Sequence, residues 1–153
     1  MEQVTTFKAS GYAIGDLQLF HDVDTSSVAE LLADCPVVRV EAGELILEPH
    51  GKNTPLYLVL RGAIGARNAD MQTGKTDNAI AKLLPGECVG ELAVLDEAAS
   101  TTTVCALEEA ELLVISADRL WQLIDHSNGV ARNLLRLLSF RIRAANALSL
   151  IHI

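Results

Sequence analysis

The chain has 153 residues, of which 50% are hydrophobic and 21% are charged. This length and composition predict one folded domain and exclude an intrinsically disordered chain, because so large an apolar fraction is enough to form a core. The 12 basic and 20 acidic residues give a formal net charge of −8, which argues against a surface that binds nucleic acid through its phosphates.

The sequence also limits the location of the protein and its metal chemistry. It has no run of about 18 apolar residues and no apolar segment at its N-terminus, so we expect a cytoplasmic protein with no membrane contact. Cys35, Cys88 and Cys105 are odd in number and widely spaced. That pattern favours buried thiols over a disulfide framework or a zinc site, and no metal site is predicted.

The N-terminal region divides into two parts. Residues 1–18 show weak hydrophobic periodicity, interrupted by Gly11 and Gly15, and are expected to form an arm or a short helix. An amphipathic helix follows, and its apolar positions are Val28, Leu31, Leu32 and Cys35. Ser27 and Glu30 have the spacing of a capping box at its start, and Pro36 is expected to end it.

The middle of the chain has the pattern of an all-β domain. Seven short β-favouring runs are separated by turn residues, and they cover residues 37–40, 45–48, 56–60, 63–67, 79–84, 102–107 and 111–115. Glycine and asparagine between the runs suit hairpin turns, because both accept positive φ angles. The pattern predicts an antiparallel barrel or sandwich.

Two helices are predicted after the strands. Ser116 is the expected N-cap of a short helix, and Ser127 or Asn128 is expected to cap a longer one that continues to Ala145. The apolar residues of the longer helix are Val130, Leu134, Leu135, Leu137, Leu138, Phe140 and Ile142. They are too many for one narrow stripe, and a chain this short has few elements left to cover a second face. The helix therefore predicts a homodimer.

The same helix is the basic part of the chain. Arg132, Arg136, Arg141 and Arg143 lie there without an acidic residue among them. Such a cluster is typical of a solvated helix face, or of a face that lies against acidic surface, rather than of a nucleic-acid-binding arm.

One segment has the residue types of an anion site. In residues 84–104, Gly90 permits a close backbone approach, and a short helix starting at Leu92 would present free amides to an anion. Glu91, beside those amides, is able to accept hydrogen bonds from a diol. Taken alone, the segment is also explained by a tight crossover between strands with an acidic residue near a helix N-terminus.

Residues 89–95 resemble the phosphate-binding cassette of cyclic nucleotide-binding domains, the family of bacterial catabolite activator proteins and of protein kinase A regulatory subunits. The resemblance extends over residues 19–148 and includes residues 43–46 and 57–62. It implies a mainly β fold, an eight-stranded antiparallel β-roll of jelly-roll type with flanking α-helices. The expected parts are an N-terminal arm or helix (1–18), the β-roll (19–128) and a C-terminal helix (129–153) that serves as lid and dimer contact.

The resemblance also assigns roles to residues. Glu91 matches the acceptor for the ribose 2′-hydroxyl, and Gly90, Leu92 and Ala93 match the backbone cradle of the phosphate. The family's phosphate arginine falls at position 100, where this chain has a serine.

The change at position 100 replaces a charged donor with neutral hydroxyls. Ser100, Thr101 and Thr102 are candidate donors to the phosphate and base, and the threonines equally fit an ordinary strand. Losing the arginine costs roughly 2–3 kcal/mol of binding, unless Arg67, Lys75 or Lys82 reaches the site. We expect any binding of cAMP or cGMP to be weak. Asn146 and Ser149, near the end of the lid helix, are further candidates for contact with the base.

Three hypotheses remain open at this stage. The first is a stand-alone regulatory module that binds cAMP, cGMP or a related nucleotide and signals through its C-terminal helix. The second is a degenerate domain that has lost ligand binding and acts as a dimerising interaction module. The third is a different ligand in the same pocket.

Enzymatic activity and DNA binding are not expected. The chain lacks the His-x-His pattern of metal-binding cupins, and no arrangement of catalytic residues is recognisable. No helix-turn-helix follows the long helix before Ile153, so we also expect no direct contact with DNA.

Overall fold

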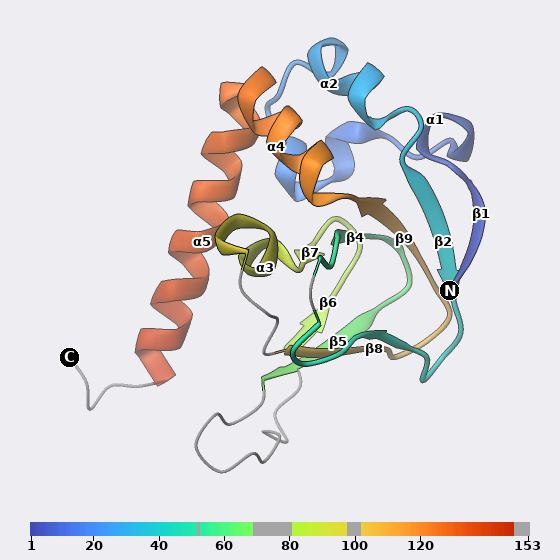
Figure 1. The fold of residues 1–153 in the computed structure, drawn as a ribbon, viewed down its shortest axis with the longest axis vertical. Helices are drawn as coiled ribbons and strands as arrows, with labels where there is room; N and C mark the ends of the chain where they lie inside the picture. The colour runs from blue at the N-terminus through green and yellow to red at the C-terminus, as the bar shows by residue number, and fades with distance from the viewer. Residues whose placement is uncertain (52, 69–80, 98–101, 149–153) are drawn as a thin grey trace.

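The computed structural model describes residues 1–51, 53–68, 81–97 and 102–148. Its strands form two antiparallel sheets (Figure 1). The five-stranded sheet has the order β1 (Glu2–Thr6), β2 (Pro36–Val40), β9 (Ala110–Ile115), β4 (Leu56–Arg61) and β7 (Cys88–Val89). The four-stranded sheet has the order β3 (Leu45–Leu47), β8 (Thr102–Ala106), β5 (Ile64–Asn68) and β6 (Ala81–Leu83). The predicted mainly β fold with flanking helices is confirmed.

The described residues form nine strands, one more than the eight expected. The added strand is β1, in the segment expected to be an arm or a short helix, and it pairs with β2 before the short helix α1 (Phe7–Ser10). Its half-exposed residues give little alternation in the sequence, so pairing with β2 decides its conformation. The hydroxyl of Tyr12 holds the following segment to the sheet by donating to Glu111 Oε1 at 2.6 Å.

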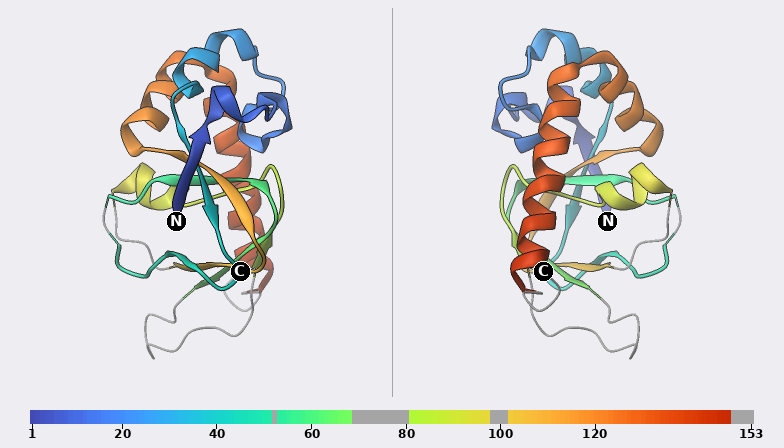
Figure 2. Two further views of the ribbon diagram at one scale, coloured as in Figure 1. Left: turned by 90° about the vertical axis from the view of Figure 1, so that its right-hand side faces the viewer. Right: turned by 90° about the vertical axis from the view of Figure 1, so that its left-hand side faces the viewer.

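The remaining helices gather at one end and along one side of the roll (Figure 1). They are the 3-10 turns η1 (Ile14–Asp16) and η2 (Gln18–Phe20) and the α-helices α2 (Thr25–Leu32), α3 (Glu91–Asp96), α4 (Ala117–His126) and α5 (Asn128–Leu148). In the right-hand view of Figure 2, α5 runs along the face that is turned to the viewer, and α3 lies to its right. Among the described residues, no helix is both long and apolar enough to cross a bilayer.

The helix caps follow the predictions in two places and correct one. Ser116 caps α4 by accepting from the amide of Arg119, and Ser127 caps α5 by accepting from the amide of Val130. The capping box predicted at Ser27 is wrong, because the side chain of Asp24 accepts from the Ser26 amide and starts α2 earlier. This helix ends at Leu32, and Pro36 is the first residue of β2.

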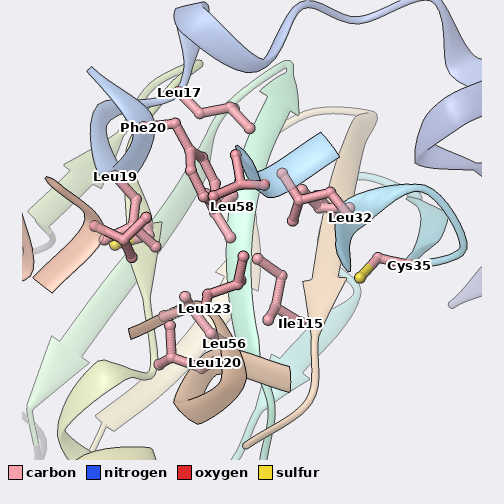
Figure 3. Close-up of a cluster of buried hydrophobic side chains, with 14 of the residues drawn as sticks. Leu17, Leu19, Phe20, Leu32, Cys35, Leu56, Leu58, Ile115, Leu120 and Leu123 are labelled. Carbon is pink, nitrogen blue, oxygen red and sulfur yellow. The ribbon is translucent and has the colours of Figure 1, made fainter. Parts of the chain in front are cut away.

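Two hydrophobic clusters hold the fold together. One lies between the five-stranded sheet and the helices, where Leu56, Leu58 and Ile115 meet Phe20 and Leu123 (Figure 3). The other fills the roll between the two sheets. Strand β4 serves both clusters, because successive side chains point to opposite faces: Leu56 and Leu58 pack under the helices, while Tyr57 and Val59 face the roll.

The cysteines are free thiols. Cys35 and Cys88 are buried as predicted, whereas Cys105 is half-buried. Within the described residues, no three histidine, cysteine, aspartate or glutamate side chains gather as metal ligands would.

Candidate functional site

The turn from β7 into α3 forms the base of the site. Gly90 caps α3 in a left-handed conformation with φ of 101°. A Cβ atom at this position would lie 2.8 Å from the carbonyl oxygen of Pro55, so both the backbone angle and the space require glycine. The helix begins at Glu91, one residue before the predicted start at Leu92, because the turn at Gly90 already places Glu91 in the first helical position.

Glu91 is the central side chain of the site. It is 2% exposed and is the one buried charged residue in the described part of the chain. Its Oε1 atom forms an ion pair with Nη1 of Arg141. Its Oε2 atom is buried and has no hydrogen-bond partner among the residues described. A buried polar atom without a partner is costly, so Oε2 has hydrogen-bonding capacity that the described residues leave unused.

Arg141 joins α5 to this site. Besides its ion pair with Glu91, its Nη2 atom donates to the backbone oxygen of Cys88. Of the two alternatives for the basic helix face, solvated or lying against acidic side chains, Arg141 agrees with the second. The spacing along the sequence indicates that Arg141 faces the domain. The buried residues of α5 include Val130, Leu134 and Leu137, and Arg141 comes four residues after the last of them, on the same face of the helix.

The other cassette residues differ in how they meet the site. Leu92 is 61% exposed, so its side chain points outward, while Ala93 is half-buried. Thr102 lies on the same face of β8 as Val104 and Ala106, which pack inside the roll. Ser100, Thr101 and Ser149 lie outside the described residues, and Asn146 lies within α5.

Two of the cations named as possible replacements for the arginine that the resemblance implies at position 100 face away from the roll. Ile64 and Ala66 of β5 pack into the roll, so the exposed Arg67 lies on the opposite face. On β6, Leu83 packs into the roll and the preceding Lys82 is exposed on the other side. The third candidate, Lys75, lies outside the described residues.

The long helix has a second anchor two turns before Arg141. Asn133 donates from Nδ2 to the backbone oxygens of Leu19 and His21, at 2.9 and 2.8 Å. A surface cavity of about 440 Å³ lies beside this anchor and is lined by residues of η1, η2 and α5, including Gln18, Arg136 and Phe140. Glu91 does not line it, so the cavity is separate from the cassette.

Cys88 is the first residue of β7, and its thiol is expected to be unreactive. Burial raises the pKa of its thiol to about 11, and the nearby charge of Arg141 opposes this rise only in part. At neutral pH the group is therefore a protonated apolar filler beside the site.

Comparison with known proteins agrees with this geometry. The family model of the cyclic nucleotide-binding domain matches residues 37–127. The chain belongs to this family. The match spans strands β2 to β9 and α3, and so includes the turn that holds Glu91.

Individual relatives are similar over most of this chain. The cyclic AMP receptor protein of Thermus thermophilus is 36% identical over 91 residues, which cover 60% of this chain and 41% of that protein. The CRP-like cAMP-activated global transcriptional regulator of Mycobacterium tuberculosis is 25% identical, over 84% of this chain and 56% of its own length. The chain thus spans less than two thirds of these relatives.

Solved structures show the same fold. The catabolite activator protein of Thermus thermophilus superposes with a TM-score of 0.77 at 30% identity, covering 88% of this chain and 63% of that chain. A cyclic nucleotide-binding domain from Methylobacillus flagellatus gives a TM-score of 0.74 at 24% identity, covering 88% of this chain and 76% of the other.

Proposed function

We propose that this chain is a regulatory module that binds a ribose-containing nucleotide beside Glu91, with cAMP and cGMP as the first candidates. The observation that carries the proposal is the buried carboxylate of Glu91, whose Oε2 atom has no partner among the described residues. A ribose 2′-hydroxyl is a donor of the right kind for this atom, and Gly90 leaves the backbone open to close approach.

The proposed signal passes through α5. Arg141 of this helix forms an ion pair with Glu91, so a ligand that donates a hydrogen bond to Glu91 changes the surroundings of Arg141. A ligand changes the preferred position of the helix only if it binds one position more tightly than another. The difference between the two binding free energies limits the size of the change. In this proposal the module performs no chemistry of its own, lies in the cytoplasm and makes no direct contact with DNA.

The second candidate function is a dimerising interaction module without a ligand. It is favoured by the ion pair that already occupies one oxygen of Glu91, and by the exposed apolar residues Leu135, Phe140 and Ile142 on α5. Ser100 in place of the family's arginine favours the same candidate. A different ligand in the same site is the third candidate, and titration with nucleotides separates it from the first.

The test compares cAMP with 2′-deoxy-cAMP by isothermal titration, supported by thermal shifts, since a ligand that binds only the folded state raises the melting temperature. Wild type is expected to bind cAMP at least ten-fold more tightly than 2′-deoxy-cAMP, because one hydrogen bond to a charged group contributes about 1.5–3 kcal/mol. In Glu91→Gln this difference is expected to shrink, while the exposed Glu108→Gln variant keeps it.

Two results would contradict the proposal. Equal affinity of wild type for cAMP and 2′-deoxy-cAMP would show that Glu91 does not accept a hydrogen bond from the ribose 2′-hydroxyl. Absence of binding for both cAMP and cGMP at millimolar concentration would leave the interaction module as the better account.

A further inference from the structure

We propose that the surface cavity between η1, η2 and α5 is a second ligand site, which takes a small zwitterion with an aromatic ring, the chemical class of the aromatic amino acids. The inference goes beyond the proposed function, because the cavity is separate from the cassette and the ligand class is different. Three features carry it: the apolar floor of the cavity, two opposite charges on its wall and the exposed ring of Phe140.

The first step is the size and floor of the cavity. Its volume of about 440 Å³ lies in the range of small-molecule sites and leaves room for a ligand of amino-acid size. Leu17 and Leu137 line the cavity and are buried, so two segments far apart in the sequence form an apolar floor. Such a floor favours a ligand with a ring or an aliphatic group over a bare ion.

The second step is the pair of opposite charges on the wall. Asp16 of η1 and Arg136 of α5 both line the cavity and are exposed. Neither side chain forms an ion pair or a hydrogen bond with another described residue, whereas Arg119 and Arg141 each pair with a carboxylate. A ligand with both a carboxylate and an ammonium group places each charge beside its opposite.

The third step is the ring of Phe140. Phe7 and Phe20 are buried, but Phe140 is 71% exposed and lines the cavity. It comes four residues after Arg136, so the ring and the guanidinium lie on neighbouring turns of one helix face. Ile142 is rotated by about 200° from Phe140 around the helix axis, so a dimer contact there leaves the ring uncovered. A second ring that stacks on Phe140 gains contact area beside the apolar floor.

A ligand in this cavity would connect α5 to the N-terminal segment. Asn133 also lines the cavity, and it already holds α5 by donating to the backbone oxygens of Leu19 and His21. A zwitterion between Asp16 and Arg136 adds a second connection between the same two parts of the chain. Because this site exists only in the folded protein, its ligand raises the melting temperature.

The test titrates the full chain with L-tryptophan, tryptamine and indole-3-propionate by isothermal titration calorimetry. Tryptamine lacks the carboxylate and indole-3-propionate lacks the ammonium group, so each compound removes one of the two charges. Wild type is expected to bind L-tryptophan about ten-fold more tightly than either analogue. The melting temperature is expected to rise most with L-tryptophan.

Three variants assign the contacts. Arg136→Gln is expected to remove the preference for L-tryptophan over tryptamine, and Asp16→Asn the preference over indole-3-propionate. Phe140→Ala is expected to weaken the binding of all three compounds. The matched control is Arg143→Gln, an exposed arginine of the same helix that does not line the cavity, and it is expected to bind as wild type does.

Three results would overturn the inference. The first is the absence of saturable binding of L-tryptophan to wild type at millimolar concentration. The second is equal affinity of wild type for the three compounds, which decides the ligand class without any variant. The third is a loss of binding in Arg143→Gln as large as in Arg136→Gln. None of these measurements uses cyclic nucleotides, so the inference stands or fails separately from the proposed function.

Discussion

At the scale of single residues, burial separates neighbouring side chains of the cassette. Glu91 and Leu92 are neighbours, yet Glu91 is 2% exposed and Leu92 is 61% exposed. The first turn of a helix separates adjacent side chains by about 100°. The acid therefore faces inward, where a carboxylate is costly without a partner, and the leucine faces solvent. This orientation places a polar group where an apolar one would ordinarily lie.

Cys88 provides a prediction at this scale. Because burial raises its thiol pKa to about 11, the reactive thiolate is scarce at pH 7.5 and the sulfur is shielded from reagents. We expect maleimide to modify the half-buried Cys105 first and Cys88 much more slowly, as measured by mass spectrometry of peptides.

The control for this experiment is the unfolded chain, in which all 3 cysteines become accessible. Raising the pH towards the pKa of Cys88 increases its thiolate fraction, and so its labelling is expected to accelerate with pH. Modification of Cys88 at the rate of Cys105 in native protein at pH 7.5 would contradict the burial of this thiol.

At the scale of elements, the turn from β7 to α3 depends on Gly90. Its left-handed φ acts against any larger residue, and so does the Pro55 carbonyl oxygen, which would lie 2.8 Å from an added Cβ atom. The position of α3 follows from this glycine, and with it the position of Leu92 and Ala93, which the resemblance assigns to the phosphate cradle. Close packing between the turn and the segment before β4 therefore supports the candidate site.

Gly90→Ala tests this dependence. The variant is expected to lose about 1–3 kcal/mol of unfolding free energy, measured by urea denaturation, because it combines backbone strain with a clash. Gly11→Ala is the matched control, since Gly11 has φ of 82° but a Cβ there meets nothing within 4 Å. The control isolates the strain term, so an equal loss in both variants would show that the Pro55 contact has no energetic role.

At the scale of the whole molecule, α5 links the helical end of the domain to the cassette. Its first half is held by Asn133 and by buried Val130 and Leu134, and Arg141 reaches Glu91 further along. Leu135 and Ile142, 67% and 61% exposed, are seven residues apart and so share one face of the helix. An exposed apolar stripe of this kind favours association with a second copy.

We therefore predict a homodimer through α5, measured by size-exclusion chromatography with light scattering. The double variant Leu135→Glu and Ile142→Glu is expected to be a monomer. Its melting temperature is expected to change little, because both side chains are already exposed in the single chain. Leu107→Glu, at a 43% exposed leucine between β8 and β9, is the control and is expected to remain dimeric. A monomeric wild type across micromolar concentrations would contradict this prediction.

Sequence patterns were sufficient for most of the architecture. The seven predicted β runs, the two C-terminal helices and the caps at Ser116 and Ser127 depend on local alternation, turn residues and hydrogen-bonding side chains, all of which are legible along the chain. Strand β7 is not among the seven runs and is expected only from the resemblance, because two residues contain too little pattern. Strand β1 was not predicted because it is defined by pairing with β2.

The candidate site also has features that local sequence determines and features that only the tertiary structure determines. The spacing of Gly90 and Glu91 in a cassette-like run is local, so the sequence alone predicts an acid beside a helix N-terminus. The resemblance to the family implies an arginine at position 100, where this chain has a serine. The partner of that acid was decided by tertiary structure. Arg141 lies 50 residues away along the chain, and the packing of α5 through Val130, Leu134 and Leu137 brings its guanidinium to Glu91. Local patterns do not encode such a contact, because it depends on how two distant elements meet.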